Sequence, residues 1–339
     1  MADEIWTVKR ILEWIEGYLA HHDDENPRVS AQWLVSEALG VSRMQLFLDA
    51  ERPLTNDERS VLRDWTRRRG AHEPLQFITG ETAFRHITVK VREGVLIPRP
   101  ETEVLVSEAL ALLPAAPKPQ EAFDEALLKL AEQLAETQES IDSDISPDAT
   151  TIDGELADQA PAQHEPILLV ADLCTGSGCI ACSIAYEQPR TCVYGTDISP
   201  DAVALARENV ANLGLEDRVT ILECDLGAGI DASLVGMFDL VISNPPYVPT
   251  RVLDELPLEV SSFEPALALD GGSDGLEVFR KILVWCTDAL RPGGSFAFEL
   301  HETCLDAAAE LARNAGYVNV RIARDLADRP RVLTGSKPL

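Results

Sequence analysis

The chain has 339 residues, a length typical of about two domains, with 29 basic and 57 acidic residues and a net charge of −28. So acidic a surface repels nucleic-acid phosphates, which argues against direct nucleic-acid binding unless a local basic patch overrides it. Seven cysteines without a disulfide framework, no basic and apolar leader, and no apolar run of about 18 residues predict a cytoplasmic protein without membrane contact.

Residues 1–80 are predicted to be helical. Apolar side chains recur at helical spacing between Ile5 and Leu19, and a second such run follows around Trp33. The sequence Thr-Asn-Asp-Glu at 55–58 has the pattern of a capping box, so it predicts the start of another helix, which stops near Gly70.

The pattern changes to strands from 82 to 98, with Glu93-Gly94 as the expected hairpin turn, and a helix is expected from 98 to 113. The segment that follows is strongly acidic, with 13 acidic and two basic residues between 118 and 165. It lacks the apolar surface needed to order itself, so we expect a disordered insertion at about 117–165.

One part of the insertion is amphipathic and predicts a short helix, through Phe123, Leu127, Leu130 and Leu134. The insertion is either a partner-binding arm or a tolerated surface element. We favour the second interpretation because acidic tracts are usually just solvated.

From residue 167 onward, strands and helices alternate, as in a doubly wound, mostly parallel α/β sheet. Seven strands are expected, at 167–173, 192–197, 219–224, 238–243, 295–300, 318–322 and 331–334. Helices are expected at about 179–187, 200–213, 275–290 and 302–315.

Polar residues at the ends of three successive strands outline a nucleoside-shaped crevice. The first strand leads into the loop Cys-Thr-Gly-Ser-Gly at 174–178, whose glycines let the backbone approach a ligand. Asp197 ends the second strand, where a carboxylate can accept both hydroxyls of an adenosine ribose, and Asp225 ends the third, where it can accept from an adenine amino group. The third glycine of a dinucleotide motif is absent, so we expect a cofactor without pyrophosphate, S-adenosyl-L-methionine.

The fourth strand leads into Asn244-Pro245-Pro246-Tyr247. The two prolines remove backbone donors, so this loop presents carbonyl groups. The Asn244 side-chain oxygen and the Pro245 carbonyl form a pair of acceptors for a planar –NH2 group, whose lone pair they localise and whose growing positive charge they stabilise. Tyr247 can stack on a flat amide or base, so the motif alone suits a glutamine amide and a base amine equally.

Cys174, Cys179 and Cys182 have a spacing known from iron–sulfur proteins. They fall within the nucleoside loop and the helix after it, where small residues pack against a sheet. We therefore expect no metal site.

Together with these motifs, three segments resemble the bacterial peptide chain release factor glutamine methyltransferases, the family of HemK type. They are 73–80 (Glu-Pro-Leu-Gln-Phe-Ile-Thr-Gly), 96–103 (Leu-Ile-Pro-Arg-Pro-Glu-Thr-Glu) and 263–267 (Phe-Glu-Pro-Ala-Leu). The resemblance covers 1–116 and 167–339. It implies N5-methylation of the glutamine in the Gly-Gly-Gln motif of class-1 release factors, and we expect a monomer.

The resemblance also implies a division of the chain into a helical substrate-binding domain at 1–80, a β-hairpin linker at 81–98 and a methyltransferase domain at 99–339. It implies cofactor contacts at Cys174, Thr175, Gly176, Ser177, Gly178, Asp197, Asp225, Leu226 and Asn244. It implies that the substrate glutamine is clamped by Asn244, Pro245, Pro246 and Tyr247. The family usually has glycine where Cys174 stands, so this position departs from the pattern.

Two other functions remain open. One is N-methylation of an exocyclic amine of a DNA or RNA base, against which the acidic composition argues. The other is a cofactor-binding module without catalysis, against which the intact Asn244 and Tyr247 argue. The densest cluster of positive charge in the sequence comprises Arg63, Arg67, Arg68 and Arg69. It is either a surface on which the protein substrate docks or merely a solvated helix end.

Overall fold

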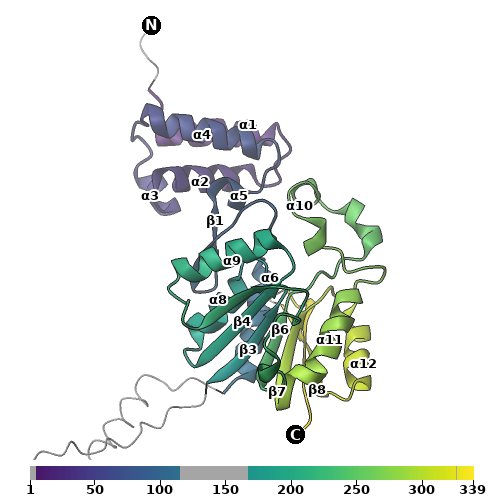
Figure 1. Cartoon of the computed structure of the whole chain (residues 1–339). Helices are drawn as coiled ribbons and strands as arrows, with labels where there is room; N and C mark the ends of the chain where they lie inside the picture. Colours follow the sequence, from purple (N-terminus) through teal and green to yellow (C-terminus); the bar gives the residue numbers. More distant parts are fainter. Residues whose placement is uncertain (1–4, 115–166, 326) are drawn as a thin grey trace, which may run out of the picture.

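The computed structural model describes residues 5–114, 167–325 and 327–339. Its amino-terminal part is a helical bundle (Figure 1), made of α1 (Val8–Ala20), α2 (Pro27–Leu39), α3 (Arg43–Leu48), α4 (Asn56–Arg69) and α5 (Leu75–Thr79). The predicted capping box is confirmed, since the Thr55 and Glu58 side chains each accept the other's backbone N–H at the start of α4. The bundle has a hydrophobic core of its own, around Ile15, Leu34 and Leu62.

A β-hairpin of β1 (Glu81–Phe84) and β2 (Ile87–Lys90) lies between the bundle and the larger sheet (Figure 1). Its turn is at 85–86, so the prediction of a hairpin turn at 93–94 was wrong. Arg85 adopts a φ of 52°, a conformation that glycine usually supplies. The contact that holds it there comes from far along the chain, because its guanidinium binds both carboxylate oxygens of Glu187 at 2.6 and 2.7 Å.

The rest of the chain forms a seven-stranded sheet in the order β5-β4-β3-β6-β7-β9-β8. Its strands are β3 (Leu168–Leu173), β4 (Thr191–Asp197), β5 (Val219–Glu223), β6 (Phe238–Ser243), β7 (Leu290–Glu299), β8 (Val318–Arg324) and β9 (Pro330–Ser336). Only the pairs β7–β9 and β9–β8 are antiparallel. The expected doubly wound, mostly parallel sheet is confirmed, although β7 begins at Leu290, earlier than predicted.

Helices cover both faces of the sheet (Figure 1). One face packs against α6 (Pro100–Leu112), α8 (Cys179–Glu187) and α9 (Pro200–Asn212), and the other against α11 (Glu277–Ala289) and α12 (Leu305–Asn314). Short helical segments lie in the connections, namely η1 (Ala232–Leu234), η2 (Thr250–Glu255), α10 (Leu258–Ser261) and η3 (Ala266–Ala268). With both faces covered, the strand ends are left as the place for a ligand.

The acidic segment 117–165, with its expected disorder and short helix, lies outside the described residues. Within the ranges that the structure does describe, none of the helices has the length and apolar character needed to cross a membrane.

Candidate active site

The candidate site lies where the sheet reverses its winding. β3 and β6 are neighbours although β4 and β5 come between them in the chain, and open α/β sheets bind ligands at such a point. Leu173 at the end of β3 pairs with Thr196 on β4 and with Ser243 on β6. This register brings three predicted site positions to one level, namely Cys174, Asp197 and Asn244.

The loop 174–178 is fixed by a buried carboxylate, Asp172. Its Oδ2 accepts from the Thr175 hydroxyl at 2.6 Å and from the backbone N–H of Ala181 at 3.1 Å. Burial raises the pKa of Asp172 to about 7, and these two hydrogen bonds act in the opposite direction. The Asp172 carboxyl group thus binds both the loop, at Thr175, and the first turn of α8, at Ala181.

The two glycines of this loop have different roles. Gly176, with φ of +56°, has no atom within 4 Å of the position that a Cβ would take, so its backbone faces open space. Gly178, with φ of +78°, packs against α9 so closely that a Cβ would lie 3.1 Å from the Cβ of Ala206. The first glycine therefore exposes the backbone to a ligand, and the second allows the helix to pack.

A cavity of about 290 Å³ lies over the strand ends. The predicted site residues that line it are Cys174, Gly176, Asp197, Asp225, Leu226, Asn244 and Pro246. The remaining walls come from the turn at 94–96, the stretch 265–270 and Lys281 of α11, to which the sequence assigned no role. The cavity thus joins the expected cofactor residues to the expected acceptor residue Asn244.

Asp197 is already oriented by the backbone around it. Its Oδ2 accepts from the N–H of Gly176 and its Oδ1 from the N–H of Ser199, both at 2.9 Å. Burial raises the pKa of Asp197, and the backbone N–H groups partly offset this. Because the two carboxylate oxygens offer about four lone-pair sites, at least one stays available to a ligand after the backbone N–H groups are bound. Asp225 is exposed at the cavity wall and precedes Leu226, whose φ is 49°.

Five predicted site residues do not line this cavity. Thr175 and Ser177 line a smaller neighbouring cavity of about 30 Å³, to which Asn244 and Thr102 also contribute. Gly178, Pro245 and Tyr247 line neither of the two. The Tyr247 ring instead packs against the hydrophobic core on the side of α11 and α12.

The Asn-Pro-Pro-Tyr loop is anchored through two side chains. Asn244 Nδ2 donates to Thr102 Oγ1 at 3.2 Å, and the Tyr247 hydroxyl donates to Glu299 Oε1 at 3.1 Å. Burial and the Glu299 carboxylate raise the pKa of Tyr247, so the phenol stays protonated. Within the described part of the chain, Asn244 Oδ1 and the Pro245 carbonyl accept no hydrogen bond. Asn244, which lines the cavity, therefore has its oxygen available to a substrate, whereas Pro245 is buried and lines neither cavity.

The three cysteines with iron–sulfur spacing lie in the loop before α8 and in α8 itself. Cys179 and Cys182 are buried in the core beneath α8, and burial raises the pKa of both thiols. Cys174 packs against the core on the other face of the sheet. In residues 5–114, 167–325 and 327–339, no group of three or more side chains is arranged to hold a metal ion.

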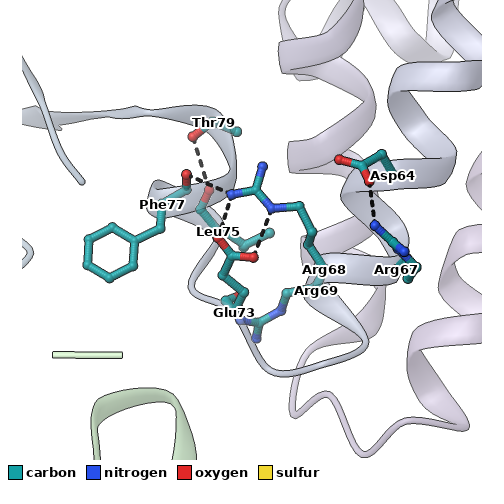
Figure 2. Close-up of polar contacts among 8 residues, drawn as sticks. All are labelled: Asp64, Arg67, Arg68, Arg69, Glu73, Leu75, Phe77 and Thr79. Atoms are coloured by element: carbon teal, nitrogen blue, oxygen red, sulfur yellow. Dashed lines mark hydrogen bonds and ion pairs between the residues drawn. The ribbon is translucent and has the colours of Figure 1, made fainter. Parts of the chain in front are cut away.

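The basic end of α4 is largely neutralised by carboxylates (Figure 2). Arg68 binds Glu73 and also donates to the Phe77 carbonyl at 3.3 Å. Arg69, only 10% exposed, binds Asp24 at 2.6 Å. Arg63 and Arg67 remain exposed, the latter beside Asp64 (Figure 2). Two of the four arginines, Arg68 and Arg69, are thus paired within the bundle, and the docking role of the cluster stays a prediction that rests mainly on Arg63 and Arg67.

The stretch 248–270, which supplies one wall of the cavity, is tied to the earlier part of the chain. Glu264 is buried and accepts from the backbone N–H of Ile97 at 3.3 Å and from Arg99 at 2.6 Å. Burial raises the pKa of Glu264, and Arg99 opposes this shift. Arg69 of the bundle also reaches Glu259 of α10 at 3.2 Å. The cavity wall thus contacts both the linker and the bundle.

Sequence reasoning assigned no role to Thr102, Glu264 or Glu299. Thr102 and Glu264 lie in segments that were noted only for their family resemblance. Glu299 is the last residue of β7, the same kind of position as Asp197 on β4. The sequence predicted this strand at 295–300, so Glu299 did not stand at a predicted strand end and the rule that identified Asp197 did not reach it.

Comparisons with known proteins agree with this geometry. Residues 10–80 match the family model described as the PrmC N-terminal domain, and residues 159–256 match the methyltransferase small domain. The release factor glutamine methyltransferase of Geobacter sulfurreducens is 34% identical over 98% of this chain and 97% of the relative. That of Rhodopirellula baltica is 34% identical over 99% and 98%.

Among solved structures, the release factor-specific protein-(glutamine-N5) methyltransferase of Alicyclobacillus acidocaldarius is 23% identical. The match covers 72% of this chain and 95% of that chain, with a TM-score of 0.35. Because the sequence relatives match over nearly their whole length, this chain belongs to the release factor glutamine methyltransferase family.

Proposed function

We propose that this protein transfers a methyl group from S-adenosyl-L-methionine to the side-chain amide nitrogen (N5) of the glutamine in the Gly-Gly-Gln motif of class-1 peptide chain release factors. The observation that carries the proposal is the position of Asn244. It lines the same cavity as Asp197 and Asp225 and keeps its side-chain oxygen available. Membership of the family supports the same activity.

The residues around the cavity fit this cofactor. Asp197 lines the cavity and keeps acceptor capacity for the ribose hydroxyls, and Asp225 stands exposed at the wall for the adenine amino group. Because Gly176 has no side chain, its backbone is open to the cofactor. Bound there, S-adenosyl-L-methionine supplies an electrophilic methyl group, and the positive sulfonium suits a wall that carries several carboxylates.

The Asn-Pro-Pro-Tyr loop prepares the acceptor. Asn244 Oδ1 and the Pro245 carbonyl accept the two N–H groups of the substrate amide, which orients the nitrogen and localises its lone pair. During the reaction the nitrogen gains a methyl group and loses one proton, and the two acceptors stabilise its positive charge before the proton leaves. Tyr247, whose hydroxyl donates to Glu299 and whose ring packs against the hydrophobic core, fixes the position of the loop that presents these acceptors.

We propose that residues 1–80 hold the release factor, that 81–98 link the two parts and that 99–339 catalyse. The separate hydrophobic core of the bundle supports its role as a distinct recognition element. We further propose that the protein acts as a monomer in the cytoplasm.

The decisive experiment incubates the full chain with methyl-labelled S-adenosyl-L-methionine and, in parallel, a class-1 release factor, duplex DNA and RNA. Label should appear only in the release factor and disappear when the glutamine of its Gly-Gly-Gln motif is replaced by alanine. Label in DNA or RNA alone would show a base N-methyltransferase. Cofactor binding by calorimetry without any labelled product would show a non-catalytic binding module.

A further inference from the structure

Behind the Asn-Pro-Pro-Tyr loop lie two buried polar side chains, Thr102 of α6 and Glu299 of β7. They are 2% and 1% exposed. Ser243 pairs with Phe298, so Glu299 ends β7 directly beside Asn244 at the end of β6. Burying a carboxylate costs free energy unless partners compensate. Its partners therefore indicate what it does.

Glu299 faces the two residues that anchor the loop. Its Oε1 accepts from the Tyr247 hydroxyl at 3.1 Å, and the Thr102 hydroxyl, which accepts from Asn244 Nδ2, lies close enough to lower the pKa of the carboxyl. Burial raises the pKa of Glu299, the hydroxyls of Thr102 and Tyr247 and the Arg331 guanidinium lower it, and Glu101 raises it. Glu299 Oε2 has no hydrogen-bond partner within the described residues. Glu299 Oε2 is thus available to accept a hydrogen bond from the Thr102 hydroxyl.

This arrangement decides which end of the Asn244 amide faces the substrate. An amide presents an acceptor at one end and two donors at the other, and a hydroxyl has a single hydrogen. Asn244 Nδ2 donates to Thr102 Oγ1, so a lone pair of the Thr102 hydroxyl faces Asn244. When Glu299 is ionised it can only accept, and the Thr102 hydroxyl then directs its hydrogen toward this carboxylate. Only the NH2 end of Asn244 can then bind Thr102, which leaves Oδ1 facing the substrate site.

We propose that Glu299, acting through Thr102, is a positioning residue that fixes the orientation of the Asn244 amide and so keeps its oxygen toward the substrate –NH2. This inference rests on the proposed function, because it requires Oδ1 to accept from the substrate amide. It goes further in assigning a role to two residues outside the Asn-Pro-Pro-Tyr loop.

The test compares Thr102→Val, which keeps the shape of the side chain without its hydroxyl, with Thr102→Ser, which keeps the hydroxyl. The measurements are kcat and KM for release factor, with S-adenosyl-L-methionine affinity and Tm as checks on the fold. Thr102→Val should lower kcat about 10-fold, the effect of one hydrogen bond in the transition state. Thr102→Ser should restore most of kcat, and cofactor affinity should change by less than about twofold in either variant.

Glu299→Gln extends the test, because a carboxamide can donate to Thr102 and so releases the hydroxyl from its fixed direction. This variant should lower kcat by a similar factor. In the Thr102→Val background it should lower kcat by less than about threefold more, since residues that act through one chain of contacts are not additive. A merely structural role would instead change Tm or cofactor affinity together with kcat.

Suppose that the wild-type enzyme methylates release factor and that the kcat of Thr102→Val lies within threefold of the wild-type value. That result would overturn this inference and leave the proposed function intact. Equal losses in Thr102→Val and Thr102→Ser, or fully multiplicative losses in the double variant, would overturn it too. If Glu299→Gln does not fold, the Thr102 pair still decides. A wild-type chain that leaves release factor unmethylated overturns the proposed function first.

Discussion

Replacing Asp197 by asparagine tests the cofactor site directly. The two oxygens of this carboxylate accept the backbone N–H groups of Gly176 and Ser199 at 2.9 Å, and acceptor capacity stays available for a ribose hydroxyl. Asp197→Asn keeps the size of the side chain, removes its charge and turns one acceptor into a donor. A hydrogen bond to a charged group contributes about 1.5–3 kcal/mol. Because about 1.4 kcal/mol corresponds to a tenfold change, the Kd for S-adenosyl-L-methionine should rise about 10- to 150-fold.

Isothermal titration calorimetry measures this Kd, and Glu223→Gln is the matched control. Glu223 pairs with Asp197 across β4 and β5 and is exposed, but it does not line the cavity. Its substitution removes the same charge and should leave Kd within about twofold. An Asp197→Asn Kd within threefold of wild type would refute the placement of the ribose. An equal loss in Glu223→Gln would assign the effect to net charge instead.

The same carboxylate gives a pH dependence with a defined sign. Burial raises the pKa of Asp197, while the N–H groups of Ser199, Gly176 and Ile198 oppose the shift. The ionised carboxylate binds the ribose, so its contribution is complete above the raised pKa and lost as pH falls through it. In a plot of log Kd against pH, Asp197→Asn should lack this acid limb.

Three further changes test other parts of the molecule. Asn244→Ala should lower turnover about 10²–10³-fold with little change in cofactor affinity, and turnover within threefold of wild type would contradict its role as acceptor. Replacing 118–165 with a short Gly/Ser linker should leave release-factor methylation nearly intact, since loop closure depends weakly on length; lost activity in a folded variant, judged by circular dichroism, would give the insertion a role. Arg69→Met should lower the free energy of unfolding in urea by about 3 kcal/mol, because it leaves the buried carboxylate of Asp24 with hydrogen bonds from Asn26 and Ser30 but without its cation. The exposed Arg67→Met should cost less than about 0.5 kcal/mol, and equal losses would refute the pairing argument.

The sheet and most of the site could be predicted because their signals are local. Buried parallel strands are short apolar runs, and the residue after each run marks the edge where ligands bind. That rule brought Asp197 and Asn244 to one cavity from sequence alone. The spacing of Asp197 and Asn244 in the chain does not show that they are close in space. The strand order of a doubly wound sheet does, because it brings the carboxyl ends of their strands to the same edge.

The features that escaped prediction depend on contacts between distant residues. The hairpin turns at Arg85, which has no turn propensity of its own, because Glu187 binds it from α8. The arginines at the end of α4 looked like a free basic cluster, since the partner of Arg69 lies on another segment of the bundle. A short stretch of sequence contains only one residue of each such pair. Neither the turn at Arg85 nor the ion pair of Arg69 could therefore be predicted from local sequence.

The linker between bundle and sheet is held at its hairpin turn, where Arg85 binds Glu187, and at its carboxyl end, where Glu264 accepts from Ile97 and the adjacent Arg99. These contacts restrict the movement of the linker, and with it the range of distances between bundle and crevice. If the bundle holds the release factor, the enzyme selects its substrate by distance. Only a glutamine at the matching distance from the surface docked on the bundle reaches the crevice. Selection then depends on the spacing between two regions of the substrate, and a short peptide that carries the same glutamine is too small to span it.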